Sequence, residues 1–267
     1  MKVKNGRLTV GKRTMEYLKF GSGEQALFLI PGLGDGLRTV KGLARVFSLQ
    51  YRRLAKKRTV YVLSRVNELP EGYTTRSMAA DLAAAMDVLG LDKVDLIGVS
   101  QGGMIAQWFA IDYPERLGRL VLTVTAARPN PMSLGCLERW LAFAEKGDYA
   151  GLTIDTAEVS YTEKTLKWMR LMNPLLTRIG RPKGFDRFRV QAISCLEHNA
   201  FDRLPEIRAE TLILGAEEDQ IVGAEGSREL DRQIPHSRLY LYKGYGHGVY
   251  YEKKKDWLER ICAFLQI

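Results

Sequence analysis

The segment that decides the fold reads Lys93-Val94-Asp95-Leu96-Ile97-Gly98-Val99-Ser100-Gln101-Gly102-Gly103-Met104-Ile105-Ala106. An apolar strand pattern leads into Gly-x-Ser-x-Gly, and an apolar helix pattern follows. The pentapeptide alone is a weak signal, because a glycine-serine turn between a strand and a helix need carry no chemistry. In this setting it predicts a sharp turn that strains the backbone of Ser100 and holds its hydroxyl at the tip. Gly98 and Gly102 carry no side chains that would collide where strand and helix crowd together.

Short apolar runs of strand length alternate with helical patterns along most of the chain. The predicted strands are Arg7–Val10, Thr14–Phe20, Ala26–Ile30, Thr59–Leu63, Val94–Val99, Leu120–Thr125, Thr211–Leu214 and Arg238–Tyr242. The predicted helices are Val40–Ala55, Ser77–Leu89, Gln101–Ile111, Gly226–Gln233 and Asp256–Leu265. Uninterrupted apolar runs are typical of strands buried on both faces. The alternation therefore predicts an α/β fold with a mostly parallel sheet and helices on both faces.

The pattern changes between about residues 128 and 200, where only helical stretches occur. These are Leu134–Glu145, Glu163–Met172 and Phe185–Glu197. We expect a helical cap over residues 131–200, inserted into a core of residues 1–130 and 201–267. Such an insertion would cover the carboxyl edge of the sheet, where open α/β folds bind ligands. Candidates for the pocket wall are Trp140, Trp168 and Met172, although most of the large apolar residues here should pack the cap against the core.

Composition indicates an ordinary globular protein of one large domain, or of a core with an insertion. The chain has 267 residues, of which 46% are hydrophobic and 27% charged. No apolar run approaches the roughly 20 residues that cross a bilayer, and the first residues lack the apolar segment of a secretory signal. Cys136, Cys195 and Cys262 fit small buried hydrophobes. These features predict a cytoplasmic protein without a membrane span.

The formal net charge is +9. Basic runs occur at Arg52–Arg58 and Lys253–Lys255, without interleaved aromatic residues or a nucleic-acid motif. A solvated basic surface is therefore the better interpretation, and we expect no nucleic-acid partner. The general field gives at most a weak bias toward anionic substrates.

A serine nucleophile needs a base to take its proton, and the base needs an acid to orient it. The chain has three histidines. We assign His247 as the base, because its flanking glycines follow the strand Arg238–Tyr242 and let the ring reach a cleft. His236 lies in a polar turn and is expected to be exposed. His198 ends a predicted cap helix and is expected to be a surface or capping residue, with a place near the cleft as the alternative.

The orienting acid should also follow a late strand. Glu217, Glu218 and Asp219 come directly after the strand Thr211–Leu214. We choose Asp219, because it stands where the loop turns back toward the surface, and we keep Glu218 as the alternative. The chain order is then serine, aspartate, histidine, which is the order for acyl chemistry on this type of sheet.

An oxyanion needs two preorganised N–H donors. One should be the backbone N–H of Gln101, the residue after the nucleophile. The other should come from the glycine-rich loop Pro31–Gly36, and we place it at the N–H of Leu33. Gly32 in the same loop is a further candidate for the pocket wall. The alternative interpretation is a flexible loop without a role.

Together these pieces resemble the α/β-hydrolase superfamily, in particular its small capped esterases, lactonases and C–C hydrolases. The resemblance covers nearly the whole chain and includes Gly21-Ser22-Gly23, Met78–Leu82, Tyr113-Pro114-Glu115-Arg116 and the late strands with Asp219 and Gly246-His247. It implies an eight-stranded, mostly parallel sheet and a Ser-Asp-His triad. It also implies that there is no metal and no organic cofactor.

Two segments depart from the family pattern. Pro31-Gly32 stands where relatives commonly have His-Gly, which changes the side-chain support of the oxyanion loop. Ser64–Pro70 replaces the Asp-x-x-Gly-x-Gly-x-Ser that many relatives carry. In that segment Arg65 either meets an anionic substrate or forms a surface or structural salt bridge.

The sequence therefore predicts a serine hydrolase that forms an acyl-enzyme from a small or medium carboxylic ester, thioester or lactone. Three alternatives use the same triad: an acyltransferase, a perhydrolase and a C–C bond hydrolase. A ligand-binding, receptor-like protein on a hydrolase scaffold is an alternative of another class. A small-molecule substrate is the expected partner, and a homodimer is left open.

Overall fold

The computed structural model describes residues 3–70 and 72–267. One eight-stranded sheet runs in the order β1-β2-β4-β3-β5-β6-β7-β8. Its strands are β1 Val3–Val10, β2 Arg13–Phe20, β3 Gln25–Ile30, β4 Arg58–Val66, β5 Val94–Val99, β6 Leu117–Thr123, β7 Thr211–Ala216 and β8 Ser237–Tyr242. The pairs β1·β2 and β2·β4 are antiparallel, and all others are parallel. The mostly parallel, eight-stranded α/β fold is thus confirmed.

Alternate side chains of the central strands enter different hydrophobic clusters. Phe28 of β3 and Leu96 of β5 join one cluster, and Leu27 and Ile97, their neighbours in sequence, join the other. This period of two arises because successive strand side chains point to opposite faces. It explains why both strands are apolar without interruption.

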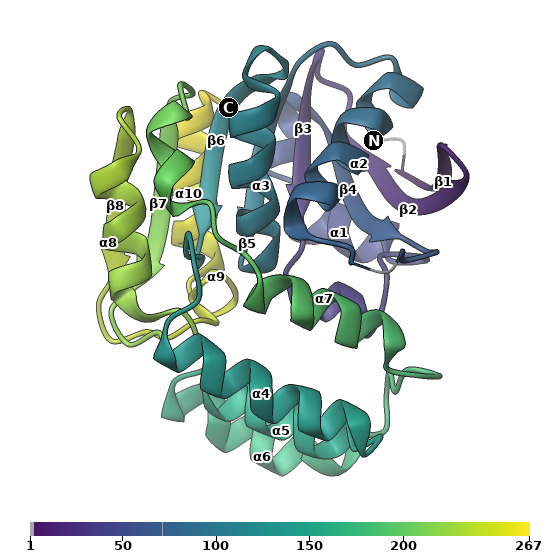
Figure 1. The fold of residues 1–267 in the computed structure, drawn as a ribbon, viewed down its shortest axis with the longest axis vertical. Coiled ribbons are helices and arrows are strands. Elements are labelled where there is room, and N and C mark those ends of the chain that lie inside the picture. Colours follow the sequence, from purple (N-terminus) through teal and green to yellow (C-terminus); the bar gives the residue numbers. More distant parts are fainter. Residues whose placement is uncertain (1–2, 71) are drawn as a thin grey trace.

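Helices cover both faces of the sheet (Figure 1). The first face is packed by α2 Thr75–Leu89, α3 Gln101–Asp112 and α8 Gly223–Gln233. The second is packed by α1 Ala44–Gln50 and α10 Lys254–Leu265, whose Trp257 and Ile261 are fully buried. A short helix, α9 Val249–Glu252, precedes α10.

Four helices separate β6 from β7 and lie beyond the carboxyl edge of the sheet (Figure 1). We call them the cap helices: α4 Pro131–Glu145, α5 Tyr149–Glu158, α6 Glu163–Leu176 and α7 Asp186–Leu196. Of these, α7 runs between the sheet and the other three. The cap helices therefore cover the strand ends at which the predicted site lies.

Three helices differ most from the sequence pattern: α1, which ends at Gln50 and not at Ala55, and α5 and α9, which were not predicted. The helix predicted from Val40 begins only at Ala44, because Gly42 has a φ of +81° and ends any helical run before it. The helix α5 was not predicted, since its glycine and threonines weaken the signal. It begins after Asp148, whose side chain accepts a hydrogen bond from the Gly151 N–H at 2.8 Å.

The sequence suggested a surface or capping position for His198, but in the structure its side chain is buried. Its Nδ1 is 2.9 Å from the Thr75 hydroxyl, and its ring meets Trp108 edge-on. Burial lowers the pKa of His198 to about 3, so the imidazole is neutral. His198 thus connects the end of the cap to the first helical layer.

In the described part of the chain, no helix has the length and apolarity to cross a membrane.

Candidate active site

The sharp turn between β5 and α3 has the geometry that the glycines predicted. Ser100 has φ 54° and ψ −121°, a strained conformation for a residue with a side chain. Side chains at Gly98 or Gly102 would overlap backbone atoms of Gly102 and Ile30 respectively. The Thr125 hydroxyl donates to the Ser100 carbonyl at 2.8 Å and holds the turn. The side chain of Ser100 therefore stands at the carboxyl edge of the sheet, where it lines a cavity.

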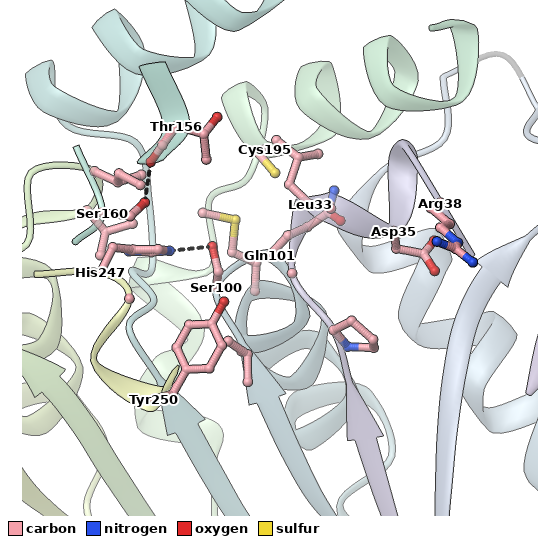
Figure 2. A pocket seen from close by; sticks show the side chains of 18 of the residues that line it. Leu33, Asp35, Arg38, Ser100, Gln101, Thr156, Ser160, Cys195, His247 and Tyr250 are labelled. Atoms are coloured by element: carbon pink, nitrogen blue, oxygen red, sulfur yellow. Dashed lines mark hydrogen bonds between the residues drawn. The ribbon is translucent and has the colours of Figure 1, made fainter. Parts of the chain in front are cut away.

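Ser100, His247 and Asp219 form a chain of hydrogen-bonding distances. The Ser100 Oγ lies 3.0 Å from His247 Nε2, and His247 Nδ1 lies 2.8 Å from Asp219 Oδ2 (Figure 2 draws the first contact). His247 and Asp219 are buried. The arrangement is able to take a proton from the serine and to stabilise the charged imidazole.

Asp219, and neither of its acidic neighbours, faces the histidine. Its Oδ1 accepts hydrogen bonds from the N–H groups of Ile221 at 2.8 Å and Val222 at 3.0 Å. Burial by itself raises the pKa of Asp219, but His247 and these two N–H groups outweigh it, so the pKa lies below its usual value. Glu218, the alternative from the sequence, is exposed.

The loop that carries His247 is tied to the cap helices. The Gly248 N–H donates to the carbonyl of Ser160, which follows α5, at 2.8 Å. Gly246 lies against the same carbonyl, where a Cβ would approach within 2.8 Å. On the core side, the Glu218 N–H donates to Tyr245 O at 3.0 Å. These contacts fix the loop that aims the imidazole at Ser100.

The glycine-rich loop after β3 passes next to Ser100. A Cβ on Gly32 would lie 3.2 Å from the Ser100 Cβ, so the loop approaches as closely as glycine allows. Leu33 begins a 3₁₀ turn and Gln101 begins α3. The N–H groups of first helical residues have no acceptor within their own helix. The backbone N–H groups of Leu33 and Gln101 are thus free of a helical acceptor, in two segments that lie next to Ser100.

The site opens into a cavity of about 420 Å³. Ser100 stands between two apolar walls, with Tyr250 on one side and Cys195 on the other (Figure 2). The core wall is Leu29, Val40, Leu43, Phe47, Tyr51, Val99 and Tyr250. The second wall combines cap residues with the core residues Met104, Ile221 and Val222; its cap members are Leu137, Trp140 and Cys195. The walls belong to separate hydrophobic clusters, so Ser100 lies at the boundary between them.

The model of the alpha/beta hydrolase fold family matches residues 55–254, which include the turn at Ser100, Asp219 and His247. The chain belongs to this family. 2-Hydroxy-6-oxo-6-phenylhexa-2,4-dienoate hydrolase of Comamonas testosteroni is 26% identical over 262 residues, which are 94% of this α/β-hydrolase and 91% of the relative. A protein of Caulobacter vibrioides named "Putative carbamate hydrolase RutD" is 27% identical over 214 residues, 75% of this chain and 76% of its own.

Solved structures of α/β-hydrolases have the same fold. MGS-M2, an alpha/beta hydrolase enzyme from a Medee basin deep-sea metagenome library, matches with a TM-score of 0.86 at 21% identity and covers 98% of both chains. The enol-lactonase from Burkholderia xenovorans LB400 matches with a TM-score of 0.84 at 18% identity and covers 98% of this chain and all of its own. The resemblance inferred from the sequence is confirmed at the level of the superfamily.

In this α/β-hydrolase the support of the oxyanion loop comes from Arg65, on β4. Its Nη2 donates to the carbonyl of Pro31 at 2.6 Å and to Gln101 Oε1 at 2.7 Å. The guanidinium is buried and is not part of the cavity wall. Arg65 therefore holds the two elements that carry the Leu33 and Gln101 N–H groups. It meets neither of the expectations from the sequence, which were an anionic substrate or a salt bridge.

The same network reaches α7. Gln101 Nε2 donates to the carbonyl of Gln191 at 2.8 Å and to the Ser194 hydroxyl at 3.2 Å. Asp35 Oδ2 accepts from Arg187 Nη2 at 2.6 Å and from Gln191 Nε2 at 3.2 Å. A buried carboxylate is stable here because it is paired and hydrogen-bonded. No periodic signal along the chain points to these long-range contacts.

The predicted pocket residues divide into two pairs. Gly32 and Trp140 line the cavity. Trp168 and Met172, on α6, are not part of its wall, and Trp168 is 57% exposed. The reason is that α6 packs through Leu166 and turns its other apolar face outward.

Within residues 3–70 and 72–267, no group of three or more His, Cys, Asp or Glu side chains is placed to hold a metal ion.

Proposed function

We propose that this chain is a serine hydrolase that cleaves carboxylic esters, thioesters or lactones. The observation that carries the proposal is the Ser100–His247–Asp219 chain, with its 3.0 and 2.8 Å contacts, at the wall of a cavity. Hydrolase names among the curated relatives support the reaction class. The proposal includes a division into a core of residues 1–130 and 201–267 and a cap of residues 131–200.

In the first half of the reaction, Ser100 attacks the substrate carbonyl while His247 Nε2 takes its proton. Asp219 holds the imidazole in the tautomer with a proton on Nδ1 and stabilises the imidazolium. Negative charge develops on the carbonyl oxygen, which accepts hydrogen bonds from the Leu33 and Gln101 N–H groups. His247 then donates its proton to the leaving alcohol, thiol or lactone oxygen, and the acyl-enzyme remains.

In the second half, His247 removes a proton from a water molecule that attacks the acyl carbon. The same N–H groups receive the oxyanion again, and Ser100 leaves with the proton that His247 returns. Apolar walls on both sides of Ser100 favour a substrate with apolar groups on both sides of the scissile bond. A cavity of about 420 Å³ suits a small or medium acyl group.

C–C bond hydrolysis is the second candidate, because relatives are named as hydrolases of oxo-dienoates. These names describe substrates with a carboxylate and a ketone. Arg38 is an exposed cation on the cavity wall that is able to pair with such a carboxylate. Incubation with 2-hydroxy-6-oxo-6-phenylhexa-2,4-dienoate and analysis of both cleavage products distinguishes this reaction from ester hydrolysis.

The experiment that tests the main proposal is hydrolysis of p-nitrophenyl esters of graded acyl length. We expect turnover with a maximum at short to medium chains, followed by a decline once the acyl group exceeds the cavity. An absence of turnover on every ester and lactone, with cleavage of the oxo-dienoate, would favour the second candidate. Tight ligand binding without turnover on either class would favour a receptor-like protein.

Arg65 provides a test of the oxyanion loop. Arg65→Met removes both bonds of Nη2, so the Leu33 and Gln101 N–H groups lose their fixed positions. We expect kcat to fall about 100-fold with little change in KM, because the lost interaction acts in the transition state. Arg65→Lys, which keeps one donor, should recover part of kcat.

The matched control is Arg58→Met. Arg58 is equally buried and donates to Asp95 and Leu265, at the opposite edge of the sheet. The Arg58→Met variant should lower the Tm, but it should not show the selective loss of kcat that we expect for Arg65→Met. If both variants lose kcat in proportion to Tm, Arg65 has only a structural role.

A further inference from the structure

One side of α6 carries an exposed apolar stripe, which consists of Trp168, Leu171, Leu175 and Ile179. Their exposed fractions are 57, 76, 49 and 56%. The spacing of three, four and four residues places them on one side of a helix. The helical path continues past Leu176, because the Arg178 and Ile179 N–H groups both donate to Leu175 O at 3.1 Å. The stripe is therefore continuous over three turns.

The stripe is surrounded by positive charge. Residues 164–184 contain six cations and no aspartate or glutamate. Arg170 is paired with Glu158 and Glu163. The other five are exposed: Lys164, Lys167, Arg178, Arg181 and Lys183. A helix with an apolar face and a cationic border fits the interface of an anionic membrane, where apolar side chains enter the acyl region and cations meet the headgroups.

The stripe also lies close to the cavity. Gly180 follows Ile179, and a Cβ on Gly180 would lie 4.0 Å from Arg38 Nη1. Arg38 is an exposed residue of the cavity wall (Figure 2). A surface that receives the stripe would thus adjoin the cavity. In Figure 1, α6 forms the outer edge of the cap, away from the sheet. Its first turn contacts the core through Thr165, whose hydroxyl donates to Glu252 of α9, and the stripe begins one turn further along the chain.

We propose that the outer face of α6 docks on an anionic lipid surface. A second copy of this chain is a poorer occupant, because the five exposed cations beside each stripe outnumber Glu158 and Glu163, which already pair with Arg170, so two stripes would repel each other. An anionic lipid surface supplies an acyl region that buries the apolar side chains of the stripe. It also supplies phosphate groups, which the lysine and arginine side chains reach by extending their stems outward. The docking is peripheral, and it is independent of the proposed catalysis.

Sedimentation with vesicles tests the docking. The full chain should bind vesicles of equal parts phosphatidylglycerol and phosphatidylcholine, and should bind pure phosphatidylcholine weakly. Lys164→Gln with Lys167→Gln should lower the partition coefficient roughly 10- to 30-fold. Lys56→Gln with Lys57→Gln is the control, because it removes the same charge from an exposed pair before β4. It should leave partitioning within about twofold.

Trp168 reports the depth of insertion directly, since the other three tryptophans, Trp108, Trp140 and Trp257, are buried. Phosphatidylglycerol brominated on its acyl chains should quench the fluorescence, and Trp168→Phe should abolish that quenching. Leu171→Ser should lower partitioning about tenfold, whereas Val88→Ser, at an exposed apolar site on α2, should not.

Three results would overturn the proposal. An equal loss of binding in both lysine pairs would show that only the net charge acts. A Leu171→Ser variant that changes the oligomeric mass, in a protein that does not bind vesicles, would identify an interface between copies. Binding of single-stranded RNA, in place of vesicles, with the same variant pattern would identify a nucleic-acid surface. Ser100→Ala protein should bind vesicles as the wild type does, so failure of this proposal is separable from failure of the proposed chemistry.

Discussion

Ser100→Ala is expected to lower kcat for p-nitrophenyl ester hydrolysis by about 10⁴-fold or more. The substitution removes the hydroxyl oxygen of Ser100, which lies 3.0 Å from His247 Nε2. Without this oxygen no acyl-enzyme forms. The cavity walls remain, so binding of a non-hydrolysable ester analogue should change little. A fluorophosphonate should label wild-type protein at Ser100 and leave the variant unlabelled, as peptide mass mapping would detect.

Cys195 provides a control for Ser100, because it is a cysteine on the cavity wall and a thiol is the stronger nucleophile once ionised. Burial raises the pKa of Cys195 to about 12, so the sulfur is a neutral thiol and a poor nucleophile. Cys195→Ala should therefore keep most of the activity. Activity that persists in Ser100→Ala and disappears in Cys195→Ala would reverse the assignment of the nucleophile.

Asp219→Asn is expected to lower kcat by about 10⁴-fold, with the fold and KM largely kept. An amide is able to donate to His247 Nδ1, which favours the tautomer with its proton on Nε2. That nitrogen then cannot accept the proton of Ser100. The loss should be smaller at high pH, where hydroxide replaces general-base catalysis in part. Steady-state rates across a pH series measure both effects.

Glu218→Gln is the matched control, since Glu218 is the adjacent carboxylate and is exposed. We expect it to change kcat less than threefold, as is usual for a surface substitution away from the reacting atoms. An equal loss in both variants would mean that the loop as a whole supports activity, and Asp219 would lose its particular role.

The sheet and the members of the proposed triad were accessible from sequence because they depend on local patterns. The central strands of the sheet contain short apolar runs, and Ser100, Asp219 and His247 each follow a strand that the sequence predicted. Because parallel strands end at one edge, residues that follow them are brought together in three dimensions. The structure places the three side chains within hydrogen-bonding distance, as this argument requires.

The cap was less predictable, because a helical period shows which residues share a face and not what that face contacts. Trp168 and Met172 have the spacing of lining residues, but α6 directs this face outward. The partners of Arg65 were inaccessible for another reason. Its contacts to Pro31 and Gln101 join residues 34 and 36 positions away, and no local pattern encodes such a pair.

The position of Ser100 between two separately packed walls affects how the substrate range of this α/β-hydrolase can change during evolution. One wall of the cavity is built largely on β3, α1 and α9, and the other on α4 and the loop after β7. A substitution such as Leu43→Ala enlarges one compartment without disturbing the packing behind Leu137 in the other. If the proposed ester chemistry holds, we expect acceptance of a new acyl group and of a new leaving group to change in separate single-residue steps. Directed evolution is able to select for each of them in turn.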